Sequence, residues 1–207
     1  MVYAEKVKES FMRQYPIGTL FPSEIGICVR KSVLARRVTF KKMMGTESTD
    51  AGASIHVTVQ QYFTATMNCE AEKPVSYNID GITISGKVDL LCNNDLIELK
   101  TTGKTVFTPY ANHLMQIAVY RQALKTMGID VKGTYIVYIN RAIDDVQEFH
   151  ISESQLQTAL KQAEDYVRRY NAFKDEKNIK NIPRGDVVFC QHCEFRSICF
   201  GDITRFF

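Results

Sequence analysis

The fold is decided by residues 82–101, which have the sequence ITISGKVDLLCNNDLIELKT. Apolar side chains recur with a period of two on either side of Asn93 and Asn94, which predicts strands over residues 82–92 and 96–101. Asparagine tolerates the left-handed backbone conformations of a tight hairpin turn. We therefore expect an antiparallel hairpin with a two-residue turn.

The register of this hairpin brings two acidic side chains together. A two-residue turn makes paired residue numbers sum to 187, so Asp89 lies opposite Glu98, and Lys87 lies opposite Lys100. Facing carboxylates repel each other unless a proton or a cation lies between them, and oxygen ligands suit magnesium or manganese. The hairpin thus predicts a divalent-metal site, with Lys100 placed to hold an attacking water or to offset charge on a scissile phosphate.

The opposite face of the hairpin is apolar. It carries Val88, Leu90, Ile97 and Leu99, which we expect to pack against helices. The alternative interpretation is a surface hairpin whose polar face holds only a cross-strand ion pair and binds no metal.

The remaining chain alternates between helical and strand patterns. It predicts helices over residues 50–67, about 110–127 and about 152–173, and strands over residues 134–140 and 146–151. Ser152 and Gln155 have the spacing of a capping box, and Gly128 closes the preceding helix. A polar stretch after residue 175 leads to a tail rich in cysteine.

Length and composition indicate one globular domain over residues 1–207. The chain is 45% hydrophobic and 24% charged, which excludes disordered and fibrous classes. A net charge of +3 is too small to indicate nucleic-acid binding by itself. The sequence has no apolar run near the ~20 residues that span a bilayer and no signal peptide, so we expect a cytoplasmic protein that binds no membrane.

The cysteines suggest a second metal centre. Three fall within ten residues near the C-terminus, Cys190, Cys193 and Cys199, and three are scattered, Cys28, Cys69 and Cys92. Without a signal peptide they favour thiols or metal ligands over disulfides, hyperthermophile proteins excepted. Three clustered thiols make an incomplete four-ligand site, which a distant cysteine would complete for zinc or for an iron–sulfur cluster.

Four short motifs accompany these features. They are Gly52-x-x-x-His56, Gly86-Lys87-Val88-Asp89, Ile97-Glu98-Leu99-Lys100 and Gln116-x-x-x-Tyr120. Together with the cysteines they resemble the PD-(D/E)XK nucleases, and within them the RecB-like, CRISPR-associated exonucleases that carry an iron–sulfur cluster. Val88 occupies the position of the proline from which the PD-(D/E)XK superfamily takes the first letter of its name. That position has no metal-binding role.

The resemblance implies roles for the motif residues. His56, Asp89, Glu98 and the backbone carbonyl of Leu99 would hold magnesium or manganese, and the imidazole favours manganese. Lys100 would position the attacking water.

The resemblance also implies contacts to the nucleic acid. Gln116 and Tyr120 would line the groove of a nucleic-acid strand, although packing at the edge of the core is the alternative. Arg30, close to the cysteines, is the best candidate for a contact to the DNA backbone.

Four cysteines match the cluster ligands of that family: Cys28, Cys190, Cys193 and Cys199. A 4Fe-4S cluster is favoured over a 2Fe-2S cluster, and zinc is the other chemistry that four thiolates satisfy. Cys28 and the 186–207 tail would then form a cap that pins the two ends of the domain together. Cys69 and Cys92 are interpreted as small buried hydrophobes.

The fold implied is α/β and restriction-endonuclease-like, with a mixed central sheet of about five strands flanked by helices. The activity implied is metal-dependent cleavage of single-stranded DNA, as an exonuclease commonly running 5′ to 3′ and as a candidate endonuclease. Partners would be proteins of CRISPR adaptation or of archaeal-virus replication in the host cytoplasm, or a second copy of the chain. The rival is a non-catalytic DNA-binding or assembly subunit of a spacer-acquisition complex, with structural zinc or iron–sulfur; the intact carboxylates and lysine argue against it.

Overall fold

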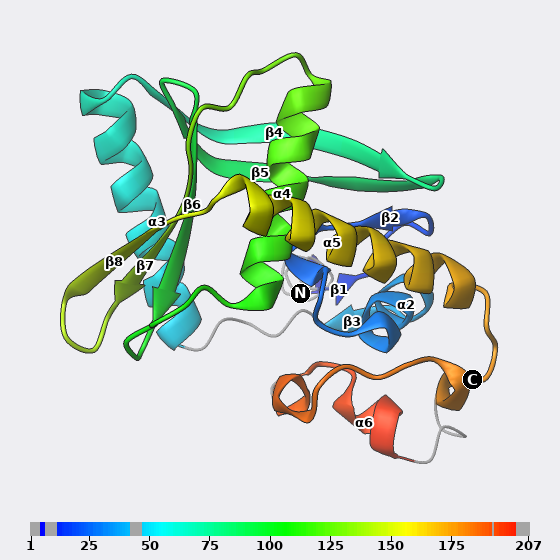
Figure 1. Ribbon diagram of the computed structural model, residues 1–207. Helices are drawn as coiled ribbons and strands as arrows, with labels where there is room; N and C mark the ends of the chain where they lie inside the picture. Colours follow the sequence, from blue (N-terminus) through cyan, green and yellow to red (C-terminus); the bar gives the residue numbers. More distant parts are fainter. Residues whose placement is uncertain (1–4, 7–11, 42–46, 192, 202–207) are drawn as a thin grey trace.

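The computed structural model describes residues 5–6, 12–41, 47–191 and 193–201, and its centre is a mixed sheet of six strands (Figure 1). These strands are β2 (Thr19–Leu20), β4 (Cys69–Ile79), β5 (Ile82–Cys92), β6 (Asp95–Thr102), β7 (Thr134–Asn140) and β8 (Asp145–His150). A small separate sheet pairs β1 (Met12–Arg13) with β3 (Phe40–Lys41).

The helices are α2 (Val29–Arg37), α3 (Glu47–Thr66), α4 (Ala111–Thr126), α5 (Glu153–Phe173) and α6 (Arg196–Phe200). Short 3-10 helices are η1 (Pro22–Glu24), η2 (Ile179–Asn181) and η3 (Val187–Cys190). Ser152 caps α5 in the predicted capping box, and Gly128, with φ of 78°, follows α4. In the described part of the chain no helix is both long and apolar enough to span a membrane.

The strand order is β2-β5-β6-β7-β8, and β4 pairs with β5. The β6–β7 pair is parallel and is connected through α4, as a parallel pair requires a crossover. The sequence predicted a sheet of about five strands and located four of them, and β2 and β4 complete the observed six. Strand β4 contains Pro74, which fits because β4 pairs only with β5 in the sheet and so lies at an edge.

The predicted hairpin register is confirmed next to the turn, but the β5–β6 pairing does not extend to Asp89 and Glu98 or to Lys87 and Lys100. Leu90 pairs with Ile97, Leu91 with Leu96, and Cys92 with Asp95, so each pair sums to 187. The turn residues Asn93 and Asn94 adopt φ values of 50° and 71°.

The two faces of the sheet are covered by different helices (Figure 1). One face packs Leu90 and Leu99 against Val59 and Phe63 of α3. The other face carries the main core, to which α2, α4 and α5 contribute.

The position of Val88 differs from the prediction that it shares one apolar face with Leu90, Ile97 and Leu99. It lies in the main core, whereas Leu90, two residues later, lies under α3. The change of face occurs at Asp89. Opposite it on β4 lies Glu72, which has a left-handed φ of 54°, and these two residues are not paired in the β4–β5 ladder. Strict alternation therefore fails at the one residue of β5 for which we predicted a metal contact.

Cys69 and Cys92 form a disulfide, so their interpretation as unpaired buried hydrophobes is wrong. They are buried and face each other directly in the β4–β5 register, with Cα atoms 4.1 Å apart. The sequence could not show this proximity without β4.

The cysteine-rich tail packs beneath α2 (Figure 1). A second apolar cluster joins Leu34 and Ala35 of α2 to Phe195 and Ile198 of the tail. A Cβ atom at Gly185 would lie 1.9 Å from the carbonyl oxygen of Ile27, so only glycine permits this close approach. Residues 192 and 202–207 of the expected cap lie outside the described residues.

Candidate active site

Asp89 lies where β5 and β6 separate. We call the site formed there by Asp89, Glu98 and Lys100 the fork. Backbone pairing ends at Leu90 and Ile97, and beyond this pair Oδ2 of Asp89 accepts a 2.8 Å hydrogen bond from the backbone N–H of Leu99. The aspartate thus lies beside Glu98, as the register predicted. Burial raises the pKa of Asp89, while the Leu99 N–H bond lowers it.

Helix α3 brings two side chains to this fork. Nδ1 of His56 lies 3.9 Å from Oδ2 of Asp89. Gln60, one turn later, donates a 3.2 Å hydrogen bond to the backbone carbonyl of Asp89. A Cβ atom at Gly52 would lie 2.6 Å from the hydroxyl oxygen of Thr101, so this glycine lets α3 approach the end of β6.

Glu98 is the most buried carboxyl group of the site, with 2% of the residue exposed. Its Oε1 lies 2.7 Å from Nζ of Lys100 and accepts a 2.7 Å hydrogen bond from Nε2 of Gln116. Its Oε2 is buried and has no hydrogen-bond partner in the described part of the protein. Burial raises the pKa of Glu98 to about 8, although the charge of Lys100 opposes the shift.

Helix α4 contacts the Glu98–Lys100 pair through Gln116. Nζ of Lys100 donates a 2.9 Å hydrogen bond to Oε1 of Gln116, and Nε2 of Gln116 lies 3.4 Å from the hydroxyl of Tyr120. Gln116 and Tyr120 are only 6% and 5% exposed, and burial raises the pKa of Tyr120. This geometry favours the packing alternative, because both side chains are buried, Gln116 contacts Glu98 and Lys100, and Tyr120 contacts Gln116.

The profile of the PD-(D/E)XK nuclease superfamily matches residues 18–200. The chain belongs to this superfamily. Membership and the convergence of Asp89, Glu98 and Lys100 at one fork support a hydrolytic nuclease, and nucleases of this superfamily generally use magnesium or manganese.

Solved structures with the same fold include two proteins that are described as exonucleases. SSO0001 superimposes with a TM-score of 0.63 at 21% identity and covers 97% of each chain. A candidate exonuclease from Eubacterium rectale gives a TM-score of 0.52 at 16% identity, covering 74% of this chain and 63% of that one. The alkaline exonuclease LHK-Exo from Laribacter hongkongensis gives 0.50 at 11% identity, covering 83% and 94%. No curated protein sequence matches significantly.

Two polar residues close to Asp89, Gln60 and Glu72, were not predicted from the sequence. Glu72 of β4 accepts a 3.2 Å hydrogen bond from Gln60 and lies 3.2 Å from Nζ of Lys87. Its charge adds to the rise in the pKa of Asp89 and of Glu98. Gln60 could have been found from its four-residue spacing after His56, whereas Glu72 lies on a strand that we did not predict.

Arg30 does not reach solvent as a DNA contact would require. It is 7% exposed, and its guanidinium donates hydrogen bonds to the carbonyls of Ile182 and Lys180 at 2.6–3.2 Å. It also lies 3.9 Å from Sγ of Cys199. Arg30 therefore joins the tail to α2, and the prediction that it contacts the DNA backbone is wrong.

The four cysteines of the expected cluster line a single small pocket in the nuclease domain. Sγ of Cys28 accepts hydrogen bonds from the N–H groups of Lys31, at 3.4 Å, and Gly185, at 3.2 Å. Burial raises the pKa of Cys193 and of Cys199. No three His, Cys, Asp or Glu side chains among the described residues are arranged to hold a metal ion, at this pocket or at the fork.

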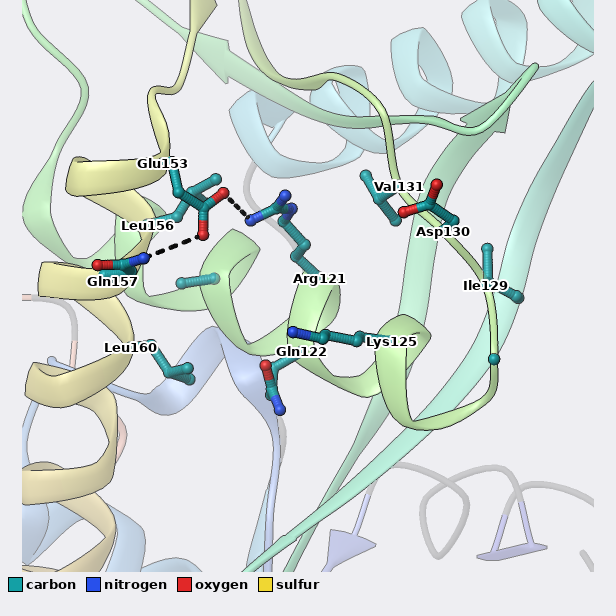
Figure 2. A pocket seen from close by; sticks show the side chains of 12 residues that line it. Arg121, Gln122, Lys125, Ile129, Asp130, Val131, Glu153, Leu156, Gln157 and Leu160 are labelled. Atoms are coloured by element: carbon teal, nitrogen blue, oxygen red, sulfur yellow. Dashed lines mark hydrogen bonds and ion pairs between the residues drawn. The ribbon is translucent and has the colours of Figure 1, made fainter.

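A cavity of about 460 Å³ lies apart from both places, between the second half of α4 and the start of α5 (Figure 2). Arg121 points to Glu153 across it, and their charged atoms are 2.5 Å apart. Glu153 also accepts a 3.4 Å hydrogen bond from Gln157. The residues of the fork take no part in its walls.

Proposed function

We propose that this protein is a metal-dependent nuclease that hydrolyses phosphodiester bonds of single-stranded DNA. One observation carries the proposal: Oε2 of Glu98 is buried near the carboxylate of Asp89 and has no hydrogen-bond partner among the residues that the structure describes. A buried carboxylate oxygen is costly unless a proton or a cation satisfies it.

The oxygen and nitrogen donors at the fork are of the kinds that magnesium and manganese bind, although the described side chains are not arranged as a three-residue metal site. His56, Asp89, Glu98 and the backbone carbonyl of Leu99 would hold the ion, and the imidazole favours manganese. When bound, the ion supplies Lewis acidity toward the scissile phosphate.

The protein's own groups would orient the reaction. The ammonium of Lys100 is held by Glu98 and Gln116, so its direction is fixed before the substrate arrives. From there it would donate a hydrogen bond to the attacking water and offset negative charge that develops on the phosphate. Gln116 and Tyr120 would act as positioning residues, because Gln116 contacts both Glu98 and Lys100, and Tyr120 contacts Gln116.

The proposed substrate is a free end of single-stranded DNA, degraded 5′ to 3′, with endonuclease cleavage as a secondary activity. Two of the similar structures carry exonuclease descriptions, which supports exonuclease action. The motif resemblance to exonucleases of single-stranded DNA supports single strands as the substrate. The motif resemblance suggests CRISPR adaptation or archaeal-virus replication and recombination as the setting.

We propose in addition that Cys28, Cys190, Cys193 and Cys199 hold a 4Fe-4S cluster. The chemistry of the donor set fits, because the four free thiols line one pocket and two backbone N–H groups already bond to Cys28. Its role would be structural, joining the tail to the start of α2. Zinc is the alternative that a metal analysis distinguishes.

A cleavage assay tests the nuclease proposal. Linear single strands labelled at the 5′ or 3′ end, and circular single strands, would be incubated with manganese, magnesium or EDTA. We expect metal-dependent cleavage, early release of the 5′ label, and slower loss of the circle. Asp95→Ala, on the same hairpin, serves as a matched control that keeps activity. DNA binding without cleavage under every condition would favour the non-catalytic subunit.

A further inference from the structure

An exposed phenylalanine lies on the loop of residues 103–110, which connects β6 to α4. Phe107 is 85% exposed, more than any other large hydrophobic side chain in the described residues. In Figure 1 the loop runs from the end of β6 to the start of α4, at the end of the sheet where α3 begins. The two elements it joins carry Lys100 and Gln116 of the fork.

The loop is anchored on both sides of Phe107. Val106 is buried, and its N–H donates a 2.8 Å hydrogen bond to the side chain of Gln147. The N–H of Tyr110 donates a 3.2 Å hydrogen bond to the hydroxyl of Tyr138. Phe107 is therefore presented by a fixed backbone, and little further ordering is needed when a ligand stacks on it.

The same loop carries a second aromatic ring and a cation. The ring of Tyr110 meets the ring of His113 edge-on, with centroids 5.4 Å apart. Nζ of Lys104 lies 5.8 Å from the centroid of Tyr110. His113 lies three residues before Gln116 on α4, and Gln116 contacts Lys100, so the loop leads directly into the helix that holds the fork.

We infer that Phe107, Tyr110 and Lys104 form a stacking surface for an unpaired nucleobase of the nuclease substrate. This inference rests on the proposed function and extends it to substrate recognition. An aromatic ring can stack only on a base whose face is open, which single strands offer and duplexes do not. Lys104 adds a cation for the adjacent phosphate. The surface would select single strands and hold them near the fork, without taking part in bond cleavage.

Substitution of the exposed ring tests the inference. The dissociation constant for a single-stranded oligonucleotide would be measured by fluorescence anisotropy in EDTA, and kcat and KM in manganese. Phe107→Ala should weaken binding and raise KM by about 5- to 100-fold, with kcat changed less than about 2-fold. Phe107→Trp should restore binding. Tyr62→Ala, which removes an exposed ring from α3, is the matched control and should bind like the unmodified protein.

Abasic substitutions in the oligonucleotide locate the stacked base. Moving one abasic site along the strand should reveal a position where affinity falls as much as it does in Phe107→Ala. In Phe107→Ala itself, the abasic site at that position should cause no further loss, because the stacking partner is already absent.

The outcomes separate this inference from the nuclease proposal. Cleavage with unchanged binding by Phe107→Ala would overturn the stacking surface and leave the nuclease intact. Binding that depends on Phe107 but never leads to cleavage would support the surface and refute the nuclease. If Phe107→Ala changes only self-association in sedimentation, the ring belongs to a protein interface and the inference is wrong.

Discussion

The carboxylate fork and the cysteine pocket are assembled in opposite ways. The fork takes Asp89, Glu98 and Lys100 from two paired strands, so the sheet itself sets their separation. The pocket takes Cys28 from the start of α2 and three thiols from residues 190–199, joined by loops and one-turn helices. The comparison teaches that strand pairing positions the fork, whereas the pocket is held by an apolar cluster and by the hydrogen bonds of Arg30, to which a metal on the proposed thiol ligands would add.

The largest expected effect is loss of cleavage at the fork. Asp89→Ala should reduce the cleavage rate by at least about 1,000-fold, because it removes a group on which the chemical step depends. Circular dichroism should show an intact fold. An unchanged rate in a well-folded sample would mean that the reaction occurs elsewhere, and Asp95→Ala controls for a general effect on the hairpin.

The next effect concerns one positioned charge. Lys100→Met keeps the apolar stem and removes the ammonium, so kcat should fall by about 100-fold, the scale seen when a charge-stabilising group is lost. DNA affinity measured in EDTA should survive, and Lys132→Met, away from the fork, should change neither quantity. Equal losses of affinity and turnover would instead identify Lys100 as a phosphate anchor.

The third effect tests the pocket. A protein with the proposed iron–sulfur cluster is brown and contains iron, and Cys193→Ser should remove both the colour and the iron. The melting temperature should fall by about 10 °C, because metal-binding energy contributes to folding. Hydrogen exchange should rise after Pro183, while cleavage should be retained wherever the domain stays folded. The paired substitution of Cys69 and Cys92 by alanine is the control that should keep the iron. Stoichiometric zinc in a colourless protein would replace the iron–sulfur assignment.

The smallest effect is a pH-dependent change in stability without added metal. Burial raises the pKa of Glu98 from 4.5 to about 8, so its neutral form stabilises the fold fully below pH 4.5, and this contribution is lost as the pH rises through about 8. Glu98→Gln cannot ionise, so in EDTA its melting temperature relative to the unmodified protein should increase by several degrees between pH 5 and pH 9.

Two controls sharpen this measurement. Manganese should reduce the difference, because it would stabilise the ionised carboxylate of the unmodified protein. The exposed Glu148→Gln should show no comparable pH dependence. A difference independent of both pH and metal would contradict a titrating carboxyl group at the fork.

The parts of the site that could be predicted are local in sequence. The turn at Asn93 and Asn94 determines which residues of β5 and β6 face each other, and the capping residues locate α5. Four-residue spacing on α4 places Gln116 and Tyr120 together. Their burial could not be predicted, because it depends on how closely α4 approaches β6.

The parts that could not be predicted depend on β4. Charged residues and Pro74 obscure its strand pattern, since an edge strand tolerates both. Without β4, neither the Cys69–Cys92 disulfide nor the approach of Glu72 to the fork was visible. Arg30 likewise resembled a surface cation until the tail was placed over it.

The Cys69–Cys92 disulfide also makes the β4–β5 hairpin a covalent ring. The ring contains both Glu72 and Asp89, and its strands meet at the exposed turn of Asp80 and Gly81. A protease that cuts this turn would leave the two fragments attached, so the nicked protein would migrate as one species on a gel until a reductant releases them. The strand that carries Asp89 is thereby protected against a single cut at its most accessible end.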